Sequence, residues 1–174
     1  MNIPDRYNGI ATLNHWITAL LVTAMWVLGR AASEAPAAAE DYIIGIHIAL
    51  GFFVLWFVLW RIGYRVVTRA PRVLVPNTLQ RTAARWMHRL LLLLLLTLVL
   101  SGPLYLFTEG EGMDVFGWFT FYIPVPASHA VHEAIEEVHT FSGEWLLPLL
   151  LGLHILAAAL HWLGRRDTSP SELQ

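Results

Sequence analysis

Four long apolar stretches constrain this chain more than any other feature of its sequence. They run over residues 8–29, 41–67, 79–107 and 129–164. Each is long enough to cross a membrane, because about 20 helical residues span the hydrocarbon core. Helices pair every backbone group internally there, and the leucine run over residues 90–96 shows no strand-like alternation. We therefore expect an all-α membrane protein, a single domain over residues 1–174 built as a four-helix transmembrane bundle.

The composition supports this class and excludes several others. Of the 174 residues, 56% are hydrophobic and only 14% are charged, against about 25% charged in a typical soluble domain. We therefore expect membrane lipid as a partner and no nucleic acid. The chain has no cysteine, which excludes disulfides, iron–sulfur clusters, zinc-thiolate sites and covalently attached c-type haem.

The arginines predict the orientation of the bundle. All 11 basic residues are arginine, and ten of them lie on one side of the predicted spans. By the positive-inside rule both termini are cytoplasmic. The loop over residues 108–128 then lies outside, along the membrane interface. Arg30 is the one arginine on the outer side, where we count nine carboxylates.

Four histidines lie inside the predicted spans, at two depths. His15 and His154 are at the inner level, and His47 and His139 are at the outer level. His139 and His154 lie about 22 Å apart along one helix and about 60° apart around it. Ionisable residues inside a span are functional candidates, and neutral imidazoles ligate haem iron. The placement favours two bis-histidine haems in the bundle core, with helix-to-helix hydrogen bonds as the alternative.

Three parts of the chain resemble the bacterial cytochrome b561 family. They are Leu13-Asn14-His15-Trp16, Ile46-His47-Ile48, and His139 together with residues 152–161. The resemblance implies a multi-pass, four-helix di-haem b cytochrome of the bacterial inner membrane that exchanges electrons with quinone. Superoxide oxidation coupled to ubiquinone reduction is one activity described in that family. The resemblance also implies that His15 and His154 hold one haem and that His47 and His139 hold the other.

The spacing of the last two histidines departs from the family pattern. One extra residue lies between His139 and His154, and so does Pro148. Proline removes a helical hydrogen bond, and a π-bulge absorbs one residue. We therefore predict a kinked or bulged turn near residues 144–148. Without such a turn, His132, which shares a face with His139, becomes the alternative outer ligand. For Glu144, in the same segment, we expect a hydrogen bond to Ser142, Trp145 or nearby backbone.

Further polar residues gather at the inner end. His161 shares a face with His154, and the resemblance favours a histidine there that binds quinone, with an interfacial histidine–tryptophan pair at the lipid headgroups as the alternative. Trp162 and Arg81 or Arg85 are candidate partners in that site. His88 faces either the quinone or a haem propionate, or is a structural interface residue. Arg61 and Arg85 are candidates for pairing with propionates.

The resulting hypothesis is an oxidoreductase that carries electrons from an outer donor through two haems to ubiquinone. The donor is superoxide or a periplasmic redox protein, and the acidic outer face favours a basic protein. One alternative is a cytochrome b anchor subunit of a larger dehydrogenase or hydrogenase. Another is a histidine-lined metal or proton transporter without haem.

Overall fold

The computed structural model describes residues 6–67 and 78–166, and the expected cytoplasmic connection between them lies outside the described residues. Four segments are long and apolar enough to cross a membrane. The first three are α1 (Arg6–Glu34), α2 (Ala37–Val67) and α3 (Thr78–Glu109). The fourth consists of α4 (His129–Phe141), a π-helical turn η1 (Ser142–Leu146) and α5 (Leu147–Arg166). The predicted fold class is confirmed.

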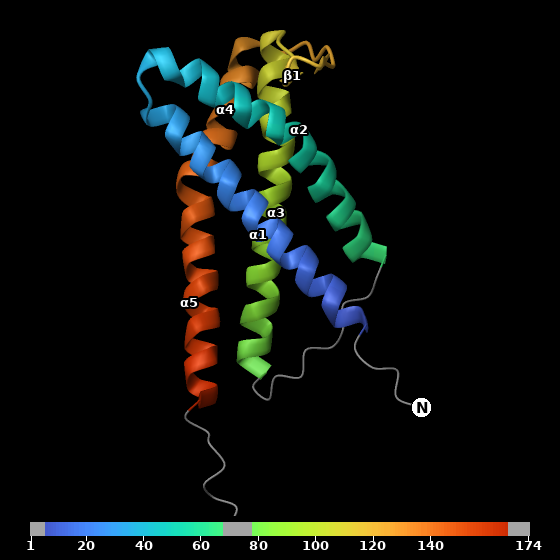
Figure 1. The fold of residues 1–174 in the computed structure, drawn as a ribbon, viewed down its shortest axis with the longest axis vertical. Coiled ribbons are helices and arrows are strands. Elements are labelled where there is room, and N and C mark those ends of the chain that lie inside the picture. Colours follow the sequence, from blue (N-terminus) through green and yellow to red (C-terminus); the bar gives the residue numbers. More distant parts are fainter. Residues whose placement is uncertain (1–5, 68–77, 167–174) are drawn as a thin grey trace, which may run out of the picture.

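The helices form two antiparallel hairpins that pack against each other. In Figure 1, α1 and α2 run diagonally across the upright pair of α3 and the α4–α5 segment. The contacts pair α1 with α2 and α3 with α4, and α2 packs on α3. The start of α1 and the end of α5 lie toward the same end of the bundle (Figure 1), as expected for termini on one side of the membrane.

The connection between α1 and α2 is shorter than the apolar pattern indicated. Helix α1 continues through Arg30 to Glu34, and α2 begins at Ala37. The carbonyl of Pro36 accepts a hydrogen bond from the backbone amide of Ala39 at 2.8 Å. Alanine is the best helix former, so this alanine-rich segment extends both helices and leaves a two-residue connection.

The outer loop contains a β-hairpin that no pattern in its sequence indicated. Strands β1 (Met113–Val115) and β2 (Phe119–Phe121) are antiparallel, with Met113 opposite Phe121. Gly117 in the turn has a φ of 70°, which glycine adopts readily. The ring of Phe52 in α2 lies 5.4 Å from that of Phe119 and 5.5 Å from that of Phe121. Aromatic packing therefore holds the hairpin against α2 at the outer end of the bundle.

Candidate functional site

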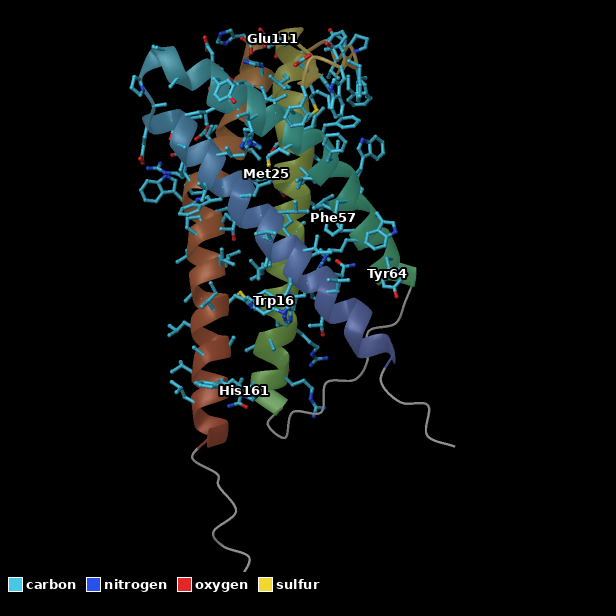
Figure 2. The ribbon with its side chains drawn as sticks, viewed as in Figure 1. Trp16, Met25, Phe57, Tyr64, Glu111 and His161 are labelled. Atoms are coloured by element: carbon cyan, nitrogen blue, oxygen red, sulfur yellow. The ribbon has the colours of Figure 1, made fainter. Side chains whose placement is uncertain are left out.

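The outer histidine pair lies in a cavity between the membrane-spanning helices. His47 of α2 and His139 of α4 both line it, with ring centroids 6.4 Å apart and ring planes at 84°. The cavity has a volume of about 280 Å³ and almost wholly apolar walls. Met113 of the hairpin and Met25 of α1 also line it; Figure 2 labels Met25 in the upper half of the bundle. An apolar cavity with a few convergent polar groups is typical of a cofactor site.

Glycines allow the neighbouring helices to approach both rings closely. A side-chain carbon at Gly29 of α1 would lie 3.5 Å from Cε1 of His47. A side-chain carbon at Gly102 of α3 would lie 3.0 Å from Cε1 of His139. Because carbon atoms pack best at about 3.5–4.0 Å, any larger residue at position 102 would displace the His139 ring.

The two outer histidines differ in the hydrogen bonds of their rings. Nδ1 of His139 lies 3.0 Å from the hydroxyl oxygen of Ser101, a residue that is buried in α3. Within the described part of the chain, Nδ1 of His47 is buried with no hydrogen-bond partner, and so is the indole nitrogen of Trp26. Trp26, His47 and His139 line the same cavity. Unpaired buried nitrogens are costly, so this cavity favours a ligand that offers them a partner.

The π-turn that the spacing predicted is confirmed. It occupies Ser142–Leu146, between His139 and His154, and ends two residues before Pro148. One turn of π-helix absorbs one extra residue, so the 15-residue spacing is equivalent to 14 residues of regular helix. Both histidines can therefore face the bundle from one continuous segment.

The inner histidine pair is more open. His15 of α1 and His154 of α5 have ring centroids 6.3 Å apart and ring planes at 64°. His88 of α3 also contacts His154, with centroids 5.3 Å apart. His15 is exposed and lies beside Trp16, which Figure 2 labels in the lower half of the bundle. The structure therefore brings three histidines together at this level.

Both predicted pairs have the separation that a shared metal ion needs. Imidazole nitrogens bind metals at about 2.0–2.1 Å, as in zinc sites, which would place two opposed rings roughly 6 Å apart. The observed centroid separations are 6.4 Å and 6.3 Å. Histidine is an axial ligand of haem iron, and apolar walls suit a porphyrin. The donor set therefore fits haem, although the assignment of ligands stays a prediction.

Arg61 joins α2 to α1 beside the inner pair. Its Nη1 donates to the carbonyl oxygen and to the side-chain oxygen of Asn14, both at 2.6 Å, and to the hydroxyl of Thr18. Asn14 precedes His15 in α1, so this network fixes the helix where the histidine lies. The predicted pairing of Arg61 with a propionate stays a prediction.

The residues predicted to bind quinone lie near the inner ends of α3 and α5. His161 and Trp162 are exposed on α5, and Figure 2 shows His161 near its end. On α3, Arg85 donates to the hydroxyl of Thr82 at 3.1 Å and to the carbonyl of Arg81 at 3.4 Å. The structure thus brings these residues to one end of the bundle, and quinone binding stays a prediction.

His132, the alternative outer ligand, lies against α3. Its Nδ1 is 2.9 Å from the hydroxyl oxygen of Thr108, and its ring centroid is 5.1 Å from that of Tyr105. It is His139 that contacts the ring of His47. Among the described residues, no group of three or more histidine, aspartate or glutamate side chains is arranged to hold a metal ion.

Glu144 has a different partner from the one expected. Its Oε1 lies 3.9 Å from Nη1 of Arg30 in α1, and Arg30 also pairs with Glu34. The expected local bond to Ser142, Trp145 or backbone therefore gives way to an ion pair between helices. Local sequence does not reveal such a partner, because Arg30 is far from Glu144 along the chain.

The residues that support His139 are not evident from the sequence. Ser101 and Gly102 lie in α3, which continues through Pro103 to Glu109. The available signal was a serine and a glycine side by side within a strongly apolar helix. Small and polar residues are typical of close helix contacts in membranes.

Known proteins resemble this chain in sequence over most of its length. Residues 6–171 match the family model described as prokaryotic cytochrome b561. The chain is also 28% identical over 179 residues to "Cytochrome b561 homolog 2" of Escherichia coli (strain K12). That alignment covers 96% of this chain and 90% of the relative.

Proposed function

Because the chain belongs to the prokaryotic cytochrome b561 family and carries histidine pairs at two depths, we propose that it is a di-haem cytochrome. It carries electrons between a donor at the outer side and quinone near the inner end. As a member of that family, the chain is a multi-pass protein of the bacterial inner membrane, binds haem b and acts in electron transfer.

One observation supports the proposal above all others. Two histidine pairs, each contributed by two different helices, have nearly equal ring separations of 6.4 Å and 6.3 Å. Histidines that merely bond neighbouring helices have no reason to share this separation at two depths. In this proposal His47 and His139 hold the outer haem iron, and His15 and His154 hold the inner one.

The chain's own residues bind and orient the haems and exclude water from them. Each bound haem supplies one-electron redox chemistry. Apolar side chains around the outer pair and the hairpin residue Met113 limit the access of water. At the inner end, His161 would donate a hydrogen bond to a quinone carbonyl oxygen, with Trp162, Arg81, Arg85 and His88 as further candidate contacts.

The charges of the outer side favour a protein donor over superoxide. A site that captures an anion is expected to be positive, but Arg30 is paired with Glu34 and lies near Glu144. Exposed carboxylates such as Glu109 and Glu111 suit a basic periplasmic redox protein. We expect the rate of reduction by such a protein to fall as ionic strength rises. A rate that does not change with salt would contradict electrostatic docking.

A haem-to-protein ratio and a reduced-minus-oxidised spectrum test the di-haem proposal. We expect two b-type haems in the wild type and one in His47→Ala, His139→Ala, His15→Ala and His154→Ala. His132→Ala is the control, because its ring lies against Tyr105 and Thr108, and it should keep both haems. A colourless wild-type protein would overturn the proposal and favour a transporter. Co-purification with a large redox subunit would favour an anchor subunit.

A further inference from the structure

We propose that Ser101 is a positioning residue for His139, which it holds in the tautomer and orientation that a metal ligand requires. This inference rests on the proposed function, since it takes His139 as a ligand of the outer haem. It concerns a residue of α3 that lies outside the four histidines and contacts one of them directly.

The direction of the contact between Ser101 and His139 follows from which ring nitrogen binds the metal. The hydroxyl oxygen of Ser101 lies 3.0 Å from Nδ1 of His139 and 3.4 Å from the carbonyl oxygen of Leu98. When Nε2 binds the iron, Nδ1 carries the ring hydrogen and donates it to the oxygen of Ser101. The single hydrogen of the hydroxyl is then directed to the carbonyl of Leu98.

Packing keeps the ring in this orientation. Ser101 is 6% exposed, so water does not compete for its hydroxyl. The next residue, Gly102, leaves room for the ring, because a side-chain carbon there would lie 3.0 Å from Cε1 of His139. Ser101 thus provides the hydrogen bond to the His139 ring, and Gly102 leaves the space in which that ring lies.

The opposite histidine has no hydroxyl partner of this kind. Nδ1 of His47 is buried without a side-chain hydrogen bond among the described residues, and its ring interacts with the backbone of Met25 instead. Metal-ligating histidines usually donate their second ring nitrogen to a neighbour, which raises their basicity. Ser101 therefore strengthens His139 as an electron donor, and its loss should weaken haem binding at the outer level alone.

Helix α3 provides a matched control seven residues further along. The hydroxyl of Thr108 donates to the carbonyl of Leu104 at 2.9 Å and lies 2.9 Å from Nδ1 of His132. This is the same hydroxyl–histidine arrangement between α3 and α4, but its histidine does not face His47. Thr108→Val thus removes an equivalent hydrogen bond without touching the outer pair.

The experiment compares Ser101→Ala, Ser101→Thr and Thr108→Val by redox titration and haem content in detergent. His47→Ala identifies the titration step of the outer haem by its absence. We expect Ser101→Ala to raise the midpoint potential of the outer haem, since a less basic ligand favours the reduced iron. We also expect about 10- to 100-fold weaker retention of that haem. Ser101→Thr keeps the hydroxyl and should restore the potential, and Thr108→Val should match the wild type.

Three results would overturn the role of Ser101. They are an unchanged outer potential and haem content in Ser101→Ala, an equal shift in Ser101→Thr or Thr108→Val, and loss of both haems in Ser101→Ala. If wild type holds two haems and one of these results appears, only this inference fails. If wild type holds no haem, the proposed function fails, and this inference fails with it.

Discussion

The outer pair of histidines lies in an apolar cavity between the helices, whereas the inner pair lies at a more open part of the bundle. His47 and His139 are half-buried, and Gly29 and Gly102 of two other helices leave little room for a side chain beside their rings. His15 is exposed, and its partner His154 also contacts His88. The ring separations are nonetheless almost the same, at 6.4 Å and 6.3 Å.

The outer and inner histidine pairs reach nearly the same ring separation in two different ways. At the outer level, the neighbours of each ring restrict where it can lie, through Gly29, Gly102 and Ser101. At the inner level, Arg61 fixes the backbone of α1 next to His15, and the His15 ring itself is exposed. Substitutions near the outer rings should therefore act on the site directly, and those near Arg61 should act through the helix.

The largest expected effect concerns which histidines form the inner pair. We expect His15→Ala to lose one of two haems completely and His88→Ala to keep both. The reason is that His88 lies 5.3 Å from His154 by ring centroids, closer than the roughly 6 Å that a shared metal ion needs. The haem-to-protein ratio of each purified variant measures this. Loss of a haem in His88→Ala with retention in His15→Ala would reverse the assignment.

The next effect concerns the space around the outer pair. Gly102→Val should lose most of the outer haem, because even its first side-chain carbon would lie 3.0 Å from the His139 ring. Gly45→Val is the control, since a side-chain carbon there has nothing within 4 Å. Optical spectra of both variants provide the measurement. Equal haem content in the two would mean that the outer site tolerates displacement of His139.

A smaller effect is expected from the hydrogen bonds that join α1 to α2. Arg61→Gln should lower the free energy of unfolding by about 2 kcal/mol, because hydrogen bonds to charged groups contribute about 1.5–3 kcal/mol. Arg85→Gln is the control, since Arg85 donates its hydrogen bonds to Arg81 and Thr82 within α3. Unfolding in mixed detergent micelles measures both. Similar stabilities would show that Arg61 does not hold the two helices together.

The smallest effect is expected at the outer ion pair. Glu144→Gln should change the free energy of unfolding by about 1 kcal/mol or less, because Arg30 keeps Glu34 as a partner. Arg30→Gln should be more destabilising, since it leaves the Glu144 carboxylate without its arginine inside a span. The same unfolding assay compares them. A larger loss of unfolding free energy in Glu144→Gln than in Arg30→Gln would contradict the expectation that Arg30 is needed to neutralise Glu144.

The sequence by itself determined the spans, the depths of the four histidines and the π-turn. Hydrophobic length and helical period are local properties, so the four apolar stretches predicted the four membrane-spanning segments. The extra residue between His139 and His154, together with Pro148, likewise predicted the π-turn at Ser142–Leu146. These features depend on residues that are close along the chain.

Only the tertiary structure decided which side chains meet across helices. The contact of Ser101 with His139, the pairing of Arg30 with Glu144 and the approach of Gly29 to His47 all join separate helices. Such contacts depend on the tilt and rotation of each helix, which the sum of packing against all neighbours sets. The hairpin over Met113–Phe121 is a further case, because its short strands are stabilised by Phe52 of α2.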